Sequence, residues 1–243
     1  MIARREDHLQ QIQDEIIKNY PNLSCEYILF NFSETQQGIT KLVEAIERIT
    51  SGNVSIFVHM AGNSDLSKHF TDVSLERNLY IMKLQVESTL ILLQNIIELI
   101  CKARPATSRT AILTSGALSA HFSIPGFAAA SANKAYIRNL TLAAGFEFRQ
   151  RFDIMCAHPI AVESEILRSS IPFSISADKF ARFTLNQLGY QKETNGCILH
   201  DFFVWIINEV DVHFVQFLFD HFIPYFSKLL QRPVDLRNLN EKI

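Results

Sequence analysis

Hydrophobic and polar positions alternate along the chain in two ways, as a helical period and as short apolar runs. The helical period, with apolar side chains every three or four positions between polar ones, predicts long helices. These helices cover Arg4–Lys18, Glu34–Ile49, Met82–Cys101 and about Ser131–Gln150. Ser33 precedes the second helix, and a hydroxyl at that place favours an amino-terminal cap.

Short runs of β-prone residues lie between the predicted helices and indicate strands. The runs are Cys25–Phe32, Val54–Val58, Ala111–Thr114 and Ile154–Ala157, and the second has the pattern of a buried strand. Strands that alternate with helices predict parallel βαβ crossovers, and therefore an α/β fold with a Rossmann-like, doubly wound parallel sheet. Ligands bind such sheets at the carboxyl ends of the strands, so the residues after each strand are candidates for a site.

Composition narrows the class of protein. The chain has 243 residues, 48% hydrophobic and 20% charged, so it can bury a substantial core and is not disordered. A net charge of −2 argues against nucleic-acid binding, which usually needs a basic surface. The four cysteines lie far apart, which favours a reducing, intracellular compartment. His59 and His158 end predicted strands, but no carboxylate stands at ligand spacing from either, so no metal is expected.

We expect one domain over residues 1–200 and a helical, aromatic-rich extension over residues 201–243. The polar start of the chain does not resemble a secretory signal, and no run of about 18 uncharged apolar residues predicts a transmembrane helix. The aromatic side chains of the extension have two interpretations. Either they pack against the sheet or a partner subunit, or residues 201–230 form a substrate lid or an interfacial helix that contacts a membrane.

Taken in order, the strand-end residues resemble the short-chain dehydrogenase/reductase family. Val58–Gly62 takes the place of that family's Asn-Asn-Ala-Gly turn, and Ile112–Gly116 looks like the strand that carries the catalytic serine. Pro125–Ala135 looks like the Tyr-x-x-x-Lys region, and His158–Ser164 resembles the Pro-Gly loop. The likeness in order and spacing extends over roughly residues 3–200.

Two stretches, Ile81–Gln94 and Thr194–His200, are similar to the 17-beta-hydroxysteroid dehydrogenase and very-long-chain 3-oxoacyl-CoA reductase branch. Ala128–Tyr136 is equally similar to a catalytically inactive relative in that branch, inactive hydroxysteroid dehydrogenase-like protein. The resemblance implies a steroid or fatty-acyl ligand and association with the endoplasmic reticulum membrane, with the cytoplasm or the mitochondrion as alternatives. It also implies a homodimer, or a heterodimer with a homologue, through the helices at Met82–Cys101 and Ser131–Gln150.

The family's catalytic roles map onto this chain incompletely. The resemblance implies that the Ser115 hydroxyl polarises the substrate carbonyl. It also implies that Gln85 stands where the family has an Asn that holds a water for proton relay. Lys134 takes the place of the Lys that lowers the pKa of a Tyr one helical turn earlier, but that earlier position is Ala130. Ser115 also stands two residues farther from Ala130 than the family pattern has it.

Other hydroxyl or imidazole groups near Ala130 are poor substitutes for the missing proton donor. Ser131 and Tyr136 face other sides of the helix, because each residue turns it by about 100°. His121 lies in the enlarged loop and is a minor candidate, with a solvated loop histidine as the favoured interpretation.

The resemblance implies NADP as cofactor. Arg4 occupies the place of the Arg that binds the 2′-phosphate, although an Arg-Arg-Glu-Asp run is more often a solvated helix start. The strand-end candidates for cofactor contacts are Asn31, Ala61, Gly62 and Pro159, together with Lys134. Ile160 replaces the Gly of the Pro-Gly loop, and no glycine cluster provides the turn that binds pyrophosphate.

The start of the chain, Ile2–Arg5, looks like the end of the family's second strand, so the first strand would precede Met1. A missing central strand leaves buried backbone groups unpaired, at about 1–3 kcal/mol each against a total stability of about 5–15 kcal/mol. Either Val54–Val58 pairs directly with Cys25–Phe30, or the chain is a fragment of a longer product.

Three functions remain open from the sequence. The chain is a reductase of this branch with little or no activity, or a non-catalytic scaffold that binds lipid or a partner, or a fragment of a longer reductase.

Overall fold

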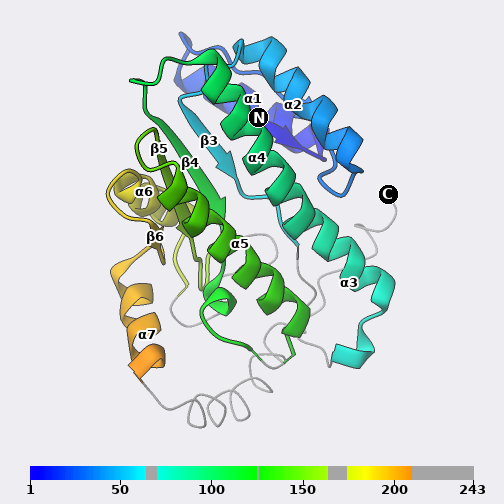
Figure 1. Cartoon of the computed structure of the whole chain (residues 1–243), viewed down its shortest axis with the longest axis vertical. Helices are drawn as coiled ribbons and strands as arrows, with labels where there is room; N and C mark the ends of the chain where they lie inside the picture. The colour runs from blue at the N-terminus through cyan, green and yellow to red at the C-terminus, as the bar shows by residue number, and fades with distance from the viewer. Residues whose placement is uncertain (64–69, 125, 164–173, 210–243) are drawn as a thin grey trace.

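The computed structural model describes residues 1–63, 70–124, 126–163 and 174–209, and Figure 1 shows their arrangement. The strands are β1 (Ile2–Ala3), β2 (Ile28–Leu29), β3 (Ile56–His59), β4 (Thr110–Ser115), β5 (Phe152–Ala157) and β6 (Glu193–Thr194). The helices are α1 (Glu6–Asn19), α2 (Gln36–Thr50), α3 (Leu75–Met82), α4 (Ser88–Ala103), α5 (Ala128–Glu147), α6 (Ala177–Gln187) and α7 (Ile198–Glu209). Two short 3₁₀ turns (Phe70–Asp72 and Leu118–Ala120) and a π-helical turn (Lys83–Glu87) complete them.

The strands form two separate parallel sheets. One sheet is the pair β1–β2, and the other has the order β3-β4-β5-β6 with every neighbouring pair parallel. This arrangement confirms the α/β class with parallel strands. It contradicts direct pairing of Val54–Val58 with Cys25–Phe30, because β2 pairs with β1 while β3 pairs with β4. A cavity lined from both sheets separates them, so no ladder joins β2 to β3.

Helices cover both faces of the larger sheet. On one face, α2 and α4 pack against alternate strand residues such as Ile112 and Ile154, which are at most 1% exposed. On the other face, Phe180 of α6 packs against Leu113 and Met155. The alternation of side chains along a strand thus supplies both layers of the core. The prediction of a buried strand at Val54–Val58 is wrong for β3, because Ile56 is 56% exposed.

The predicted helix at Met82–Cys101 is part of a longer one. α3, the π-helical turn and α4 run continuously over Leu75–Ala103, and this helix is long and apolar enough to cross a membrane. The sequence has no uncharged apolar run of this length, because the helix contains Glu87 and Glu98, so it meets the criterion by length and mean composition alone. Leu92, Ile96 and Ile100 are at most 1% exposed within the core, which is the usual environment of a core helix in a globular protein.

The other predicted elements agree with the structure to within a few residues, except at one cap. Thr35, and not Ser33, caps α2 by accepting a hydrogen bond from the Gly38 amide at 3.4 Å. The Ser33 hydroxyl donates instead to the Asn31 side chain. The helix α6 and the strand β6 were not predicted. α7 gives the extension a helical start, and residues 210–243 lie outside the described part of the chain.

Candidate functional site

The carboxyl ends of β3 and β4 meet the amino-terminal half of α5, and this junction holds the candidate catalytic residues. Ser115 is the last residue of β4, and its carbonyl oxygen accepts a hydrogen bond of 2.9 Å from Lys134 Nζ. Lys134 lies on the second turn of α5 and is only partly exposed. Its burial lowers the pKa of Lys134 to about 8, with the nearby Cys156 sulfur acting in the opposite direction. The Ser115 hydroxyl itself donates to the Gly116 carbonyl at 3.3 Å.

Gln85 reaches the same junction from the π-helical turn. Its side chain is 1% exposed, donates to the Asn63 carbonyl and accepts from Asn133 Nδ2 at 3.4 Å. A π-helical turn inside a longer helix often marks a functional site. A Cβ on Gly62 would lie 3.6 Å from Gln85 Nε2 and 3.7 Å from Lys134 Nζ. Gly62, Gln85 and Lys134 therefore lie close together.

The proton donor that this junction needs is absent at the expected place. Ala130 lies one helical turn before Lys134 on α5 and offers only a methyl group. His59, at the end of β3, is 5% exposed. Burial, reinforced by the charge of Lys134, lowers the pKa of His59 to about 4, so its ring is neutral at pH 7.

The nearby alternatives have other structural roles. The Ser131 hydroxyl accepts a hydrogen bond from the Ile124 amide at 3.4 Å, which ties the preceding loop to α5. Tyr136 is 39% exposed. His121 packs its ring against His158, with centroids 4.5 Å apart. Burial, and then the charges of His158 and Arg138, lower the pKa of His121 to about 4. The expectation of a solvated loop histidine is therefore wrong.

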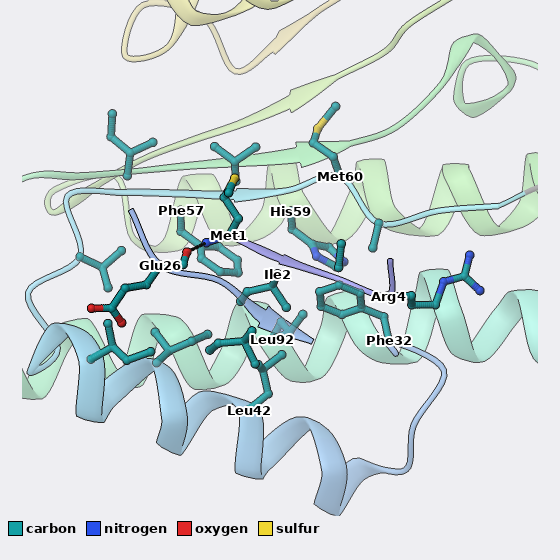
Figure 2. A pocket seen from close by; sticks show the side chains of 18 of the residues that line it. Met1, Ile2, Arg4, Glu26, Phe32, Leu42, Phe57, His59, Met60 and Leu92 are labelled. Atoms are coloured by element: carbon teal, nitrogen blue, oxygen red, sulfur yellow. Dashed lines mark hydrogen bonds between the residues drawn. The ribbon is translucent and has the colours of Figure 1, made fainter. Parts of the chain in front are cut away.

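The predicted cofactor residues divide into two groups. Arg4 (Figure 2), Ala61 and Gly62 line the cavity between the two sheets. The Arg4 guanidinium also donates to the Tyr80 hydroxyl at 3.3 Å. Asn31 makes local contacts, accepting from the Ser33 amide and hydroxyl. The Pro159 carbonyl accepts from the Leu118 amide at 3.3 Å, which joins the loops after β5 and β4. The last residue of the predicted loop, Ser164, lies outside the described residues.

These residues fit only part of a nicotinamide dinucleotide. Lys134 uses one N–H on Ser115, so its ammonium group retains donors for ribose hydroxyls. A pyrophosphate, however, needs a glycine-rich turn whose amides point at it from a helix start. The connection from β1 to α1 is Arg4-Arg5, and the side chain of Arg5, the N-cap residue of α1, does not cap the amides of that helix. Among the described residues, Lys134 thus offers donors for the ribose end of such a ligand, and the β1–α1 connection offers no phosphate cradle.

A second polar cluster lies at the same carboxyl edge of the sheet, beside β5 and β6. His158 follows β5 and is fully buried, and its ring occupies the space where Gly116 has no side chain. A Cβ on Gly116 would lie 2.2 Å from His158 Nδ1, so only glycine fits there. Glycine at position 116 therefore permits the histidine.

Glu193 of β6 supplies the charge partner of this cluster. Its carboxylate accepts two hydrogen bonds from Arg138, at 2.7 and 2.9 Å, and lies 3.3 Å from His158 Nε2. Burial opposes the charged form of His158, but the Cys156 sulfur and the Glu193 carboxylate outweigh it and raise the pKa of His158 to about 9. The contact with His158, together with Arg138, lowers the pKa of Glu193 to about 2.

His121, His158 and Glu193 present ligand atoms within 4.8 Å of one another and could hold a metal ion. The sequence argument that His158 has no carboxylate at ligand spacing is thus overturned, because β6 brings Glu193 beside it. Arg138 already occupies both oxygens of that carboxylate. An ion-pair cluster accounts for these contacts better than a metal centre.

The sequence missed this cluster because its members lie far apart along the chain. Gly116 and His158 each follow a predicted strand, and that shared position is the signal that could have placed them together. Glu193 could not be found in this way, since β6 has only two residues and no clear pattern.

Comparison with known proteins places the chain in a family. A family model described as enoyl-(acyl carrier protein) reductase, of the short-chain alcohol dehydrogenase type, matches residues 4–198. No curated protein matches the chain.

Solved structures of low sequence identity share the fold. A 7beta-hydroxysteroid dehydrogenase is 17% identical, with a TM-score of 0.73, over 90% of this chain and 85% of that one. An alcohol dehydrogenase from Comamonas testosteroni, specific for bulky-bulky ketones, is 12% identical with a TM-score of 0.70, over 98% and 86% of the two chains. An alcohol dehydrogenase from Thermococcus sibiricus, in complex with 5-hydroxy-NADP, is 16% identical with a TM-score of 0.66, over 80% of each.

Proposed function

The chain belongs to the short-chain dehydrogenase/reductase family, whose members are NAD(P)-dependent oxidoreductases, and we propose that it is a degenerate member with little or no reductase activity. Its ancestry is in the hydroxysteroid dehydrogenase and 3-oxoacyl-CoA reductase branch. The single observation that carries the proposal is Ala130 one turn before Lys134, at a junction where Lys134, Gln85 and Gly62 lie close together.

The loss of the donor has a calculable consequence. A positioned general acid contributes about 10² to 10⁴-fold to a reaction, and its removal leaves only orientation and polarisation. Ser115 and Lys134 can still face a carbonyl group, but neither is placed as a phenol would be. With a pKa of about 8, Lys134 is mostly charged at pH 7. Its ammonium group already donates a hydrogen bond to the Ser115 carbonyl oxygen.

The absent phosphate cradle supports the same proposal. Tight binding of a dinucleotide needs amides that converge on the pyrophosphate. The surviving residues, Lys134 at one end and Arg4 at the other, contact separate parts of such a ligand at most. We therefore expect weak nucleotide binding as well as weak turnover.

A direct assay tests this function. Oxidation of NADPH is followed at 340 nm (roughly its absorbance maximum) with oestrone and with a 3-oxoacyl-CoA, and NADPH binding is measured separately by fluorescence. We expect no turnover above the blank and weak binding, because a loss of about 10² to 10⁴-fold leaves little signal. Turnover comparable to that of an intact family member contradicts the proposal.

A matched pair of variants separates the two defects. Ala130→Tyr restores the phenol on the face of Lys134, while Ala129→Tyr places it on another side of α5. We expect neither variant to gain activity, because the phosphate cradle is still missing. A gain in Ala130→Tyr alone would show that the donor is the sole defect.

A lipid-binding scaffold is the second candidate, and one observation favours it. On α7 the rings of Phe202 and Trp205 stack with centroids 5.9 Å apart, and both are more than half exposed. Exposed neighbouring aromatic side chains often mark a contact surface. Lipid extracted from the purified protein, identified by mass spectrometry and lost in the double variant Phe202→Ser and Trp205→Ser, would support this candidate.

A further inference from the structure

Lys134 has an unusual environment for a lysine that faces the interior of a protein. Its Nζ donates to the Ser115 carbonyl oxygen at 2.9 Å, and among the described residues no carboxylate lies within ion-pair distance of it. Interior lysines are usually paired with an acidic group, because an isolated charge is costly to bury. The Ser115 carbonyl holds the amine in place without balancing its charge. This environment therefore favours the uncharged amine over the ammonium ion.

Two titratable groups adjoin the amine from neighbouring strands, and neither is a carboxylate. They are Cys156 of β5 and His59 at the end of β3. Burial lowers the pKa of Lys134 to about 8 despite the opposing effect of the Cys156 sulfur, while His59 is neutral at pH 7 because its own pKa is lowered to about 4. About a tenth of Lys134 is thus neutral at pH 7, compared with fewer than about one in a thousand for a lysine of ordinary pKa.

Small residues surround the amine on the side away from Ser115. Gly62 is exposed, and a Cβ built on it would lie 3.7 Å from Lys134 Nζ, an ordinary contact distance. Ala130 lies one turn earlier on the same face of α5, is half-buried and offers only a methyl group. The Lys134 side chain is itself partly exposed. A small molecule can therefore approach the nitrogen from solvent.

Hydrogen bonding leaves the reactive part of the neutral amine free. A neutral amine has two N–H groups and one lone pair, and one N–H remains on the Ser115 carbonyl oxygen. The lone pair and the second N–H are left for another molecule. A lysine whose amine is neutral and accessible is a nucleophile toward carbonyl carbon.

The Ser115 hydroxyl stands ready to assist such an attack. It belongs to the same residue that holds Lys134, and its own hydrogen bond to the Gly116 carbonyl is long, at 3.3 Å. Rotation about the Cα–Cβ bond frees this hydroxyl to donate to the oxygen of a carbonyl compound beside the amine.

We propose that Lys134 is a covalent binding site for aldehydes, in which its amine attacks the carbonyl carbon and forms an imine. An aldehyde fits this half-buried nitrogen better than a ketone, because one substituent of its carbonyl carbon is only hydrogen. The site rests, like the proposed function, on the absence of a tyrosine at position 130, but it needs neither a dinucleotide nor a hydride.

The reaction balances without any other reagent. The nitrogen lone pair forms the N–C bond, the π pair of the carbonyl moves to its oxygen, and one proton moves from nitrogen to that oxygen. The resulting carbinolamine loses its hydroxyl and the second N–H proton as water, so one aldehyde and one amine give one imine and one water. When protonated, the imine again has one N–H, which can donate to the Ser115 carbonyl.

The test is timed reaction of the whole chain with propanal at pH 7. Sodium borohydride quenches each sample and reduces the imine to a stable propyl amine, and peptide mass spectrometry locates the modified lysines. Lys102, whose side chain is 79% exposed, is the internal reference. Lys134 should be labelled at least about tenfold faster than Lys102, because much more of it is neutral amine. Labelling of Lys134 no faster than that of Lys102 overturns the proposal.

The dependence on pH provides a second readout. The labelling rate of Lys134 should level off above about pH 8, where most of the amine is already neutral. The rate at a freely exposed lysine should still increase there. A profile for Lys134 that follows that of Lys102 contradicts the proposal.

Variants separate the amine from its surroundings. Lys134→Arg keeps a cation that can donate to the Ser115 carbonyl but removes the nucleophile, so the fast adduct should disappear while thermal unfolding confirms that the variant folds. Ala130→Tyr should slow labelling of Lys134 severalfold, because the phenol covers the amine, whereas Ala129→Tyr, on another side of α5, should not. A fast adduct that persists in Lys134→Arg, or equal labelling in the two tyrosine variants, overturns the proposal.

Turnover of NADPH by the same preparation distinguishes this proposal from the proposed function. Fast labelling of Lys134 without turnover supports both. Neither labelling nor turnover overturns the aldehyde site alone, and turnover without labelling overturns both.

Discussion

The strands β3 and β4 are neighbours with similar apolar sequences, yet they differ sharply in burial. In β4, Ile112 is fully buried, with β3 on one side and β5 on the other. In β3, Ile56 pairs opposite Ala111 and is still 56% exposed. The difference lies in the neighbours: β4 has strands at both edges and helices on both faces, while β3 has a cavity at one edge.

The largest expected effect is the difference in the free energy of unfolding between substitutions at Ile112 and at Ile56. Ile112→Ala removes side-chain atoms from a closed core and should lower the free energy of unfolding by about 2–5 kcal/mol. Ile56→Ala, at the cavity edge, should cost about 1 kcal/mol or less, within the range of strand propensity alone. Urea denaturation of both variants measures the contrast. Equal losses would show that the cavity is closed in solution.

Two glycines extend the contrast to the loops that follow the same strands. Gly116→Ala, after β4, would place a Cβ 2.2 Å from His158 Nδ1, and overpacking of this kind costs about 1–3 kcal/mol. Gly62→Ala, after β3, meets its nearest side-chain atoms at 3.6 Å, an ordinary contact, and should change stability by less than about 0.5 kcal/mol. Thermal unfolding compares the two, and a larger loss from Gly62→Ala would contradict the packing described here.

The elements with strong local patterns could be predicted from the sequence, while features set by distant partners could not. The helix α2 has a clear helical period and the strand β5 is a clear apolar run, so their place in the fold followed from the pattern. Lys134, Gln85 and Gly62, which the family resemblance assigned to one site, lie close together in the structure. Residues that follow the strands were candidates for a ligand site because ligands bind parallel sheets at the carboxyl ends of their strands.

The failures share one physical cause, which is that burial depends on neighbours that the local pattern does not reveal. Val54–Val58 has the composition of a buried strand, but its exposure depends on what lies beside β3. Glu193 is one acidic residue among many until β6 places it beside His158. The π-helical turn that directs Gln85 inward has no sequence signature of its own.

Two histidines at strand ends provide the subtlest test of the comparison, because their pKa values shift in opposite directions. His158, beside Glu193, has its pKa raised to about 9, so its stabilisation is complete below pH 6.5 and is lost as the pH rises through 9. His59, buried near Lys134, has its pKa lowered to about 4, so protonation destabilises the fold as the pH falls from 6.5 through 4.

Each substitution should therefore flatten one side of the stability profile. His158→Gln should remove the alkaline slope and His59→Gln the acid slope. Each effect should be on the order of 1 kcal/mol, since the partial exposure of Glu193 and the cavity beside His59 weaken them. Unfolding free energies between about pH 4 and 9 measure the slopes, and NMR titration of the ring protons measures the two pKa values directly. A common pKa near 6.5 for both rings would mean that solvent reaches the β5–β6 cluster as freely as it reaches any surface. The contrast between the enclosed strand β4 and the strand β3 beside the cavity would then be wrong.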